Sequence, residues 1–352
     1  MKQIAVLGDT LVSGNIFGIQ RFTYEILREI DKMNPNTLEF AVVIPEYLEA
    51  NISFNNIKII KYGTIKNSFL WRQLCFPDFL KRYGYIGMDL TLGLPYQGCD
   101  IVGFFDCTYE NYKDNFVTLK EKLKRLSYLV RAKRLIKKSK KIITISQNSK
   151  KELLQYYKTT SDKLEIISCA WQHYDRIDKD ESIFDKLGLA LKEEYFFSLG
   201  SGLPHKNILW IVKAAIQNPK YKFILTGSNR FSDYLEKIGI DKIDNIIYTG
   251  YISDEEVKAL MTNCKAFIHP AFCEGFGMPP LEAISCGAEI IISNSSCLPE
   301  IYGDSARYIN PTDYAIDIDK ILKMNFNKNS EILNKYSWEL SAQKLVAILC
   351  EI

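Results

Sequence analysis

The sequence predicts an α/β protein made of two doubly wound domains, each a parallel sheet with helices on both faces. Three observations lead to this expectation. A chain of 352 residues is long for a single hydrophobic core. Short β-branched and aromatic runs alternate with amphipathic segments in two successive series, as in parallel α/β sheets. Between the two series, residues 168–185 are charged and irregular, which indicates a seam between domains.

The first series is expected to form strands at residues 3–7, 40–44, 57–60, 101–105 and 141–145, with helices mainly at 20–30 and 119–138. The second is expected to form strands at 195–199, 222–226, 246–249, 266–269 and 289–292, with helices near 208–216, 254–261 and 281–286. We therefore expect an N-terminal domain of residues 1–175, rejoined by a last helix at 337–352, and a C-terminal domain of residues 176–336. Ligands of doubly wound sheets bind beyond the carboxyl ends of the strands, so a site is expected in a cleft between the domains.

The composition is that of an ordinary globular protein, with 47% hydrophobic and 25% charged residues. A net charge of +3 is too small to indicate nucleic-acid binding. No apolar run reaches the ~18 residues that span a bilayer, and the N-terminus indicates a strand instead of a secretory signal, so we expect a cytoplasmic protein. Nine cysteines without a C-x-x-C pair, and three histidines not spaced as ligands, indicate neither a disulfide framework nor a metal site.

The most informative segment is residues 269–283, HPAFCEGFGMPPLEA. An apolar run before it predicts a strand, and its two prolines suit the first turn of a following helix, which puts Glu274 in the loop and Glu282 in that first turn. A strand, a glycine-rich loop and a helix N-terminus present N–H groups and a positive dipole end to a ligand. The alternative is a simple turn, with Glu282 complementing the dipole of its own helix.

Two further glycine-bearing loops follow expected strands. Residues 199–208, LGSGLPHKNI, place Lys206 at the start of a helix, an arrangement that suits a diphosphate. The segment is not a Walker loop, because the spacing and the following Ser or Thr are absent. Residues 13–21 follow the first strand and contain Gly18. For both loops, a solvated surface turn is the alternative.

Together these loops resemble the family 4 retaining glycosyltransferases, whose GT-B fold has two facing Rossmann-like domains with a cleft between them. The resemblance lies in E-G-F-G-M-P-P-L-E-A, the E-x7-E motif of Glu274 and Glu282, and in residues 200–207, which match G-x-x-x-P-x-K-N. Further matches are residues 249–256, 145–150 and 336–338. The resemblance covers nearly the whole chain and is strongest from about residue 194 to 311.

The resemblance implies a role for each matching position on a nucleotide-sugar donor. Lys206 neutralises the diphosphate and Glu282 holds ribose hydroxyls. The backbone around Tyr251 and Ile252 touches the base, and Gly18 lets the first helix approach the phosphates.

The same resemblance places Glu274 on the hydroxyls of the donor sugar, together with the backbone of Gly275, Phe276, Gly277 and Met278. The family needs no metal and no cofactor, in keeping with a chain that lacks a D-x-D motif suited to a divalent ion between its strands. Catalysis then rests on charge that stabilises the departing diphosphate, so Glu274 orients the sugar and is not a nucleophile.

The chain departs from the family pattern at three places. A common arginine of the phosphate loop falls at Ser201, and the usual Gly-Gly of the first loop is Phe17-Gly18. A histidine that often follows a strand of the first domain is replaced by Phe105, followed by Asp106. Asp106 either contacts the acceptor hydroxyl, as a catalytic residue, or simply caps its loop.

Residues 120–141 contain eleven Lys or Arg and one acid, Glu121, while leucines recur at helical spacing through residues 119–136. A basic amphipathic helix can lie on an anionic membrane surface, which attracts each nearby cation by about 1 kcal/mol. The alternative is a helix packed on the core with a solvated basic face.

We therefore expect a retaining hexosyltransferase that moves a sugar from a nucleotide-sugar to a hydroxyl of a lipid-linked oligosaccharide. Its expected setting is bacterial surface polysaccharide biosynthesis (capsule, O-antigen or exopolysaccharide) at the inner face of the plasma membrane. One alternative is another GT-B enzyme, an epimerase or hydrolase of nucleotide-sugars. A second is a nucleotide- or glycan-binding protein without turnover, which the departures at Ser201 and Phe105 favour.

Overall fold

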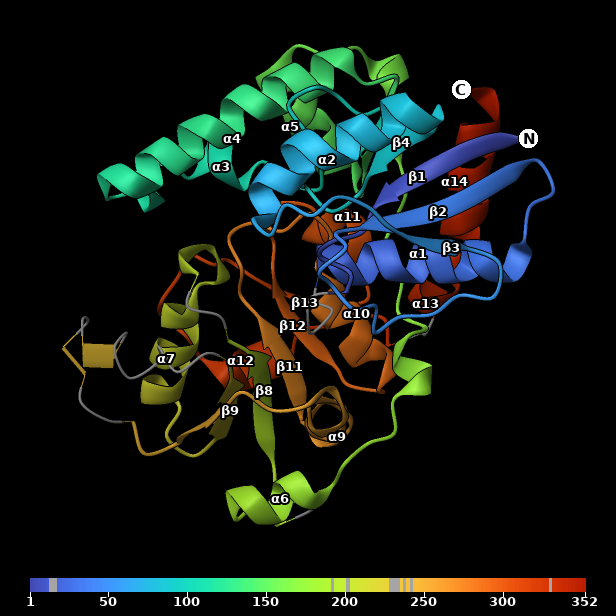
Figure 1. Cartoon of the computed structure of the whole chain (residues 1–352). Helices are drawn as coiled ribbons and strands as arrows, with labels where there is room; N and C mark the ends of the chain where they lie inside the picture. The colour runs from blue at the N-terminus through green and yellow to red at the C-terminus, as the bar shows by residue number, and fades with distance from the viewer. Residues whose placement is uncertain are drawn as a thin grey trace. The chain divides into compact units, whose positions relative to one another are not determined.

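The computed structural model describes residues 1–12, 18–190, 193–200, 203–227, 235–236, 239–240, 243–328 and 331–352. It divides into two compact units, Met1–Cys169 with Trp338–Ile352, and Ala170–Ser337 (Figure 1). Both units are built on parallel sheets, as the alternation of strands and helices predicts.

The first unit contains a seven-stranded parallel sheet in the order β3-β2-β1-β4-β5-β6-β7. Its strands are β1 Lys2–Leu7, β2 Leu38–Ile44, β3 Lys58–Lys61, β4 Ile86–Asp89, β5 Ile101–Gly103, β6 Lys141–Thr144 and β7 Leu164–Ile166. Its helices are α1 Ile19–Met33, α2 Ser68–Tyr83, α3 Thr108–Asn111, α4 Leu119–Lys138, α5 Gln147–Tyr157 and α14 Trp338–Glu351. Strands β4 and β7 are short and were not among the expected ones.

The chain returns to the first unit through its last helix. The ring of Trp338, at the start of α14, lies edge-on to Phe22 of α1 with the ring centres 6.1 Å apart. At the other end, the ammonium of Lys2 donates to the carbonyl oxygen of Cys350 at 2.7 Å. The two chain ends therefore lie close together in this unit (Figure 1).

The second unit contains a six-stranded parallel sheet in the order β10-β9-β8-β11-β12-β13. Its strands are β8 Tyr195–Leu199, β9 Lys222–Thr226, β10 Ile246–Gly250, β11 Ala266–His269, β12 Ile290–Ser293 and β13 Arg307–Ile309. Its helices are α6 Ser182–Leu187, α7 Ile208–Gln217, α9 Asp254–Asn263, α10 Met278–Ser285, α11 Leu298–Tyr302, α12 Ile318–Leu322 and α13 Glu331–Lys335. Strand β13 is an addition to the expected set.

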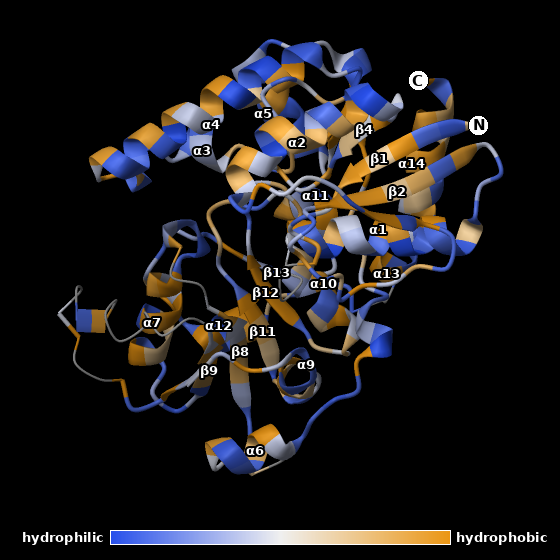
Figure 2. Ribbon diagram, viewed as in Figure 1, coloured by the Kyte–Doolittle hydropathy of each residue, from blue (hydrophilic) through white to orange (hydrophobic). Residues whose placement is uncertain are grey.

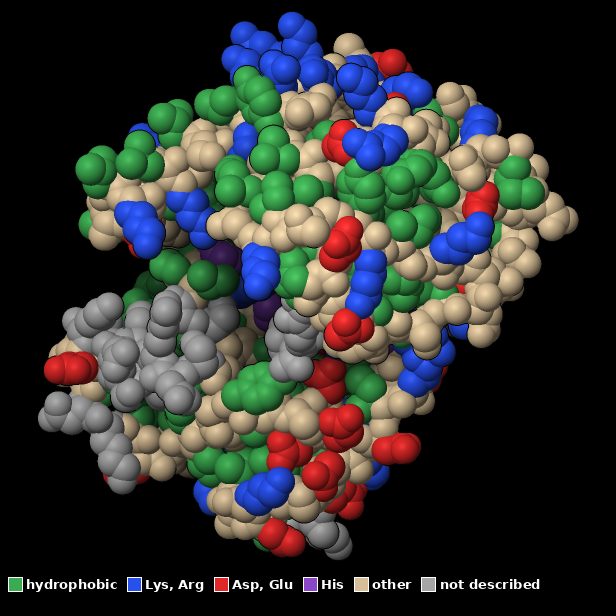
Figure 3. Space-filling model, viewed as in Figure 1, with side chains coloured by type: hydrophobic (Ala, Val, Ile, Leu, Met, Phe, Trp, Pro, Cys, Tyr) green, Lys and Arg blue, Asp and Glu red, His purple; other side chains and the backbone are tan. Residues whose placement is uncertain are grey.

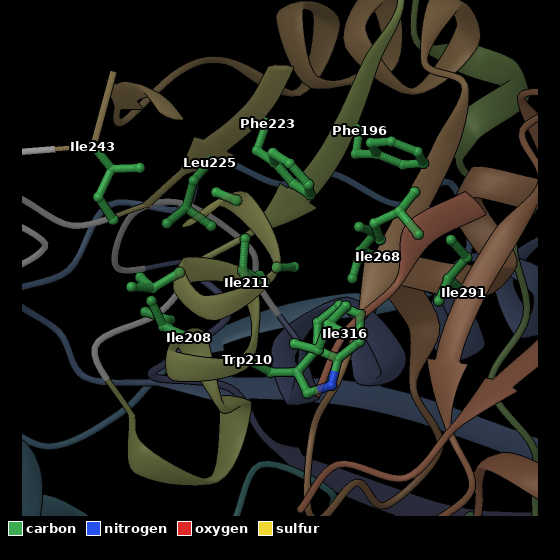
Figure 4. Packing of buried hydrophobic residues seen from close by; sticks show 14 of the residues in the cluster. Phe196, Ile208, Trp210, Ile211, Phe223, Leu225, Ile243, Ile268, Ile291 and Ile316 are labelled. Atoms are coloured by element: carbon green, nitrogen blue, oxygen red, sulfur yellow. The ribbon is translucent and has the colours of Figure 1, made fainter. Parts of the chain in front are cut away.

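The core of the second unit lies between its sheet and α7. Phe196 of β8 and Phe223 of β9 stack with their ring centres 5.4 Å apart, and Trp210 and Ile211 of α7 pack on the same side (Figure 4). Strands buried on both faces appear as continuous apolar runs, visible as orange arrows such as β12 in Figure 2. Burial at ~25 cal/mol per Å² of apolar surface is the main stabilising contribution here.

The strand order determines where this unit can bind a ligand. The sequence of strands reverses direction between β8 and β11, which pair through Ala266 and Phe196. In doubly wound sheets, the loops at the carboxyl ends of two such strands form the binding crevice. The two loops concerned are the Lys206 loop after β8 and the Glu274 loop after β11. Among the residues that the structure describes, no helix is both long enough and apolar enough to cross a bilayer.

Candidate functional site

The loops after β8 and β11 are joined by hydrogen bonds. Asn207, which is buried and has a left-handed backbone (φ 56°), donates from its amide to the carbonyl oxygens of Pro270 at 3.0 Å and Pro311 at 2.8 Å. The backbone N–H of Phe272 donates to the carbonyl oxygen of His205 at 2.8 Å. Lys206, between His205 and Asn207, is therefore held against the loop that carries Glu274.

Glu274 is the centre of a buried charged cluster. Its Oε1 lies 2.5 Å from Nζ of Lys206 and 2.7 Å from Nε2 of His269, and its side chain is 11% exposed. Burial alone raises the pKa of Glu274, but the charge of Lys206 and the hydrogen bond to His269 more than offset it. The pKa of Glu274 therefore lies well below its ordinary value, and the carboxylate is a permanent acceptor.

The Glu274 loop is held by the segment that follows β12. The Ser296 hydroxyl donates to the carbonyl oxygen of Glu274 at 2.8 Å and accepts from the N–H of Glu274 at 3.3 Å. The buried hydroxyl of Tyr302 donates to the carbonyl oxygen of Gly277. Gly277 has φ +81°, and a Cβ there would lie 2.6 Å from Cδ2 of Leu298, so both backbone and space favour glycine. The loop is pre-formed around Glu274.

The helix after this loop begins earlier than the sequence suggests. Helix α10 starts at Met278, with a proline in its first two positions, so Glu282 lies beyond the first turn. The prolines do lie in the first turn, but the expectation of Glu282 in that turn is wrong, because the helix begins at Met278 and not at residue 281. The alternative in which Glu282 complements the helix dipole fails with it, since the dipole acts within the first turn.

Glu282 has a histidine partner of its own. The Nε2 of His173 lies 3.0 Å from Oε1 of Glu282, and both residues are buried. His173 directly precedes the short 3₁₀ helix Tyr174–Arg176. Each carboxylate of the E-x7-E pair is thus contacted by a histidine, His269 for Glu274 and His173 for Glu282.

The segment expected to touch the base follows β10. Tyr251 is 64% exposed and Ile252 is half-buried. The Gly250 carbonyl oxygen accepts from the Thr226 hydroxyl at 2.7 Å and from the N–H of Gly227 at 3.0 Å. Hydrogen bonds therefore tie this segment to the end of β9.

The remaining predicted positions lie in the first unit. Gly18 is the residue before α1 and has φ 47° and ψ −108°, a conformation that favours glycine. Asp106 follows β5, and its Oδ1 accepts from the N–H of Thr108 at 2.9 Å. That contact is the loop cap expected as one alternative for Asp106. Phe17 and Ser201, two of the departures from the family pattern, lie outside the described residues.

Sequence reasoning assigned no role to His269 or His173. His269 ends β11 only five residues before Glu274, so its place at a strand end was an available signal. His173 is 109 residues from Glu282, and nothing local links the two. In the described ranges, no three side chains of His, Cys, Asp or Glu gather as a group suited to a metal ion.

Comparison with known families identifies the second unit. Residues 179–338 match the model of the family described as glycosyl transferases group 1. Residues 179–338 belong to this family. The matched region includes Lys206, Glu274 and Glu282, and the resemblance predicted from the E-x7-E segment is confirmed.

Three relatives of the chain have names that state an activity. WbdA of Escherichia coli, a serotype-specific mannosyltransferase, is 32% identical over 198 residues, which are 52% of this chain and 24% of that protein. The O-antigen chain mannosyltransferase RfbU of Salmonella typhimurium is 27% identical over 57% of this chain and 54% of its own. O-antigen chain mannosyltransferase B of E. coli is 30% identical over 50% and 49%. The chain thus spans about a quarter to half of these relatives' length.

Solved structures share the fold along the whole chain. Sucrose-phosphate synthase from Thermosynechococcus elongatus superposes with a TM-score of 0.77 at 15% identity, covering 100% of this chain and 99% of its own. Anabaena Alr3699/HepE, solved with UDP and glucose, gives 0.69 at 15% identity and 100% of both chains. WaaG, a glycosyltransferase of lipopolysaccharide biosynthesis, gives 0.64 at 16%, over 97% and 94%. These likenesses confirm the GT-B fold class.

Proposed function

We propose that this chain is a retaining, metal-independent glycosyltransferase that moves a hexose from a nucleotide-sugar to a hydroxyl of a lipid-linked oligosaccharide in bacterial surface polysaccharide biosynthesis. The observation that carries the proposal is the Lys206–Glu274–His269 cluster, placed at the switch point of a sheet in the group 1 family. Mannose is the sugar we propose, because three relatives of the chain are named as mannosyltransferases.

Lys206 supplies the charge for the departing diphosphate. An ammonium group has three donors, so one contact to Glu274 leaves two for phosphate oxygens. The Glu274 carboxylate keeps the ammonium in place before the donor arrives, which reduces the reorganisation needed at the moment of bond breaking. Charge fixed in this way lowers the barrier because negative charge develops on the diphosphate as the sugar leaves.

Glu274 orients the sugar and takes no part as a nucleophile. Two donors, Lys206 and His269, already engage its Oε1. A carboxylate with a lowered pKa accepts hydrogen bonds and donates none, which suits the hydroxyls of a sugar ring. We propose that the acceptor hydroxyl attacks on the face from which the diphosphate departs, so that the anomeric configuration is retained.

The acceptor side of the proposal rests on the first unit. Helix α4 buries only Ala132, Leu135 and Ile136, although its N-terminal part is amphipathic. Leu119 is 74% exposed, and Leu123 and Leu126 are each 58% exposed. These exposed leucines support a surface role for the N-terminal part of α4, over the alternative of a helix packed on the core with a solvated basic face.

Apolar side chains of α4 and α2, with Tyr96 of the loop between β4 and β5, line a groove of about 520 Å³; those of the two helices are Phe69, Leu74, Leu123, Leu126 and Val130. Cations border it: the guanidinium of Arg131 lies 5.1 Å from the Phe69 ring centre, and that of Arg134 lies 4.2 Å from the Tyr96 ring centre. Figure 3 shows green apolar and blue basic side chains side by side over this part of the unit. We propose that this face lies on an anionic membrane surface.

Release of nucleoside diphosphate tests the proposed activity. The protein is incubated with GDP-mannose or UDP-glucose, with and without a polyprenyl diphosphate-linked oligosaccharide. Release that depends on the acceptor is expected for a transferase. Release without acceptor indicates a hydrolase, a changed sugar without release indicates an epimerase, and binding without turnover indicates a binding protein.

Flotation with liposomes tests the membrane face separately. The protein is expected to float with vesicles that contain anionic lipid and to remain in solution with neutral ones. Equal partition into both kinds of vesicle would contradict the proposed role of the basic residues of α4.

A further inference from the structure

The second glutamate of the E-x7-E pair is held by a residue from far away in the chain. Among the described residues, His173 is the one side chain that bonds the Glu282 carboxylate, with Nε2 at 3.0 Å from Oε1. The side chain of His173 is 1% exposed and that of Glu282 is 11% exposed. A buried contact of this kind restricts the rotation of Glu282, whereas α10 alone holds only its backbone.

His173 lies in a segment that is itself firmly held. The chain enters the second unit at Ala170 and leaves it at Ser337. The indole N–H of Trp171 donates to the carbonyl oxygen of Leu333 at 2.9 Å, and the side-chain amide of Gln172 donates to that of Tyr336 at 2.9 Å. The entering and leaving segments are thus bonded to each other directly before His173.

The residues that follow His173 are held by hydrogen bonds from helix α9. The ammonium of Lys258, on α9, donates to the carbonyl oxygens of Tyr174 and Ile177, each at 2.7 Å. The Tyr174 ring lies edge-on to the His173 imidazole with ring centres 5.2 Å apart. The imidazole therefore has little freedom, and its Nε2 is a fixed anchor for Glu282.

We propose that His173 is a positioning residue for ribose recognition, which fixes the Glu282 carboxylate so that it accepts from the vicinal hydroxyls of the donor's ribose. This inference rests on the proposed function and on the ribose contact that the family resemblance implies for Glu282. A contact at Oε1 leaves Oε2 for the ligand, since a carboxylate accepts at both oxygens. A side chain already ordered loses less freedom when the ligand binds.

The two glutamates differ in whether a histidine is their sole side-chain partner among the described residues. The carboxylate of Glu274 has two partners, the ammonium of Lys206 and the imidazole of His269. It therefore keeps the ammonium if His269 is removed. Glu282 has no such second partner among the described side chains. Removal of His173 is therefore expected to affect ribose recognition selectively and to leave the diphosphate contact of Lys206 intact.

The test compares ribose with dideoxyribose ligands. Affinities of GDP and UDP and of their 2′,3′-dideoxy forms are measured by calorimetry for the wild-type protein, His173→Ala, His173→Gln and the control Gln172→Ala. In His173→Ala, the ribose form is expected to bind about tenfold more weakly, which is the effect of one hydrogen bond to a charged group, with the dideoxy form unchanged. His173→Gln retains an N–H donor and is expected to restore most of the preference.

A merely structural role for His173 predicts a different pattern. Gln172→Ala removes a hydrogen bond in the same segment without touching Glu282, so it is expected to lower stability but to keep the ribose preference. In GDP-mannose turnover, His173→Ala is expected to raise KM about tenfold with kcat within about twofold. A ribose preference equal to the wild type in His173→Ala overturns the inference.

Further outcomes separate this inference from the proposed function. If the wild type binds neither GDP nor UDP, the proposed function is overturned, and the inference with it. If the wild type binds a nucleoside diphosphate but does not prefer ribose, only the inference fails. If His173→Ala does not fold, His173→Asn replaces it, because the shorter amide does not reach Glu282. Loss of the ribose preference in His173→Asn with retention in His173→Gln supports the inference. An equal ribose preference in both variants overturns it.

Discussion

Charged residues are arranged differently in the two units of this chain. In the second unit, the charged side chains of the candidate site are largely or partly buried and paired: Lys206 with Glu274, and Glu282 beside His173. In the first unit, α4 carries its cations on the surface next to exposed leucines. We propose that this difference reflects two kinds of recognition. Fixed pairs suit a small ligand of defined shape, while an exposed basic and apolar face suits an extended and fluid surface.

Removal of the half-buried cation of the Lys206–Glu274 pair is expected to have the largest effect. Lys206→Ala is expected to reduce the rate of sugar transfer by about 10²–10³, because a fixed charge toward the departing diphosphate is lost. Initial rates of acceptor-dependent diphosphate release measure this, with Lys213→Ala of α7 as a control of the same residue type. A loss below tenfold would show that Lys206 is not the main charge on the diphosphate.

The buried pair also makes a prediction about pH. The pKa of Glu274 is lowered in the folded protein, so the pairing stabilises the fold above the ordinary carboxyl pKa of 4.5 and is lost as the pH falls toward the folded-state value. Glu274→Gln leaves Lys206 without its counter-charge and is expected to lower the free energy of unfolding by about 1–3 kcal/mol at pH 7.

Urea unfolding of the wild type and Glu274→Gln from pH 8 to pH 4 measures this difference in stability. It is expected to stay constant down to about pH 5 and to shrink below the ordinary carboxyl pKa of 4.5. A difference that grows as the pH falls would mean that the pKa of Glu274 is raised in the folded protein, contrary to the paired arrangement.

The exposed face of α4 is expected to respond to apolar substitutions. Replacing Leu123 and Val130 together by serine is expected to weaken binding to anionic vesicles at least about tenfold, because each side chain loses apolar area buried against lipid. Leu340→Ser on α14 is the matched control, since Leu340 is 56% exposed and Leu123 is 58% exposed in the same unit. Equal losses in both variants would show that α4 is not a specific membrane face.

Substitution of Asp106 is expected to have the smallest effect. It distinguishes a contact with the acceptor from a role as a loop cap only. Asp106→Ser keeps an acceptor for the N–H of Thr108, so the free energy of unfolding is expected to change by less than about 0.5 kcal/mol. We propose that the carboxylate also contacts the acceptor, so transfer is expected to fall about tenfold, with binding of GDP-mannose unchanged. Unchanged transfer would leave Asp106 as a loop cap only.

Elements with a clear pattern of apolar residues can be predicted from the sequence. Short strands whose place depends on pairing with neighbouring strands cannot. Strand β11 is a continuous apolar run because it is buried on both faces, and it was expected at its observed place. Strands β4, β7 and β13 are interrupted by glycine or charged residues (IGMD, LEI and RYI), so they lack the continuous apolar run that marks β11. Their existence depends on neighbouring strands that bring them into the sheet.

The site could be predicted only where its residues are close in sequence. Glu274 and Glu282 belong to one motif, and the family match covers both. The expected start of α10 at residue 281 is three residues late, because proline is tolerated throughout a first turn and does not mark its first residue. The bond between His173 and Glu282 depends on the path of the chain into the second unit, which no local pattern records.

Thermal unfolding with a panel of nucleotide-sugars tests the central claim, that the buried cluster of the second unit binds a donor through Lys206. A ligand that binds the folded state stabilises it by mass action, by ~2.7 kcal/mol at a hundred times its Kd. At least one nucleotide-sugar is expected to raise the Tm of the wild type, and the rise is expected to disappear in Lys206→Ala. No shift with any member of the panel, or an equal shift in both proteins, would contradict the account.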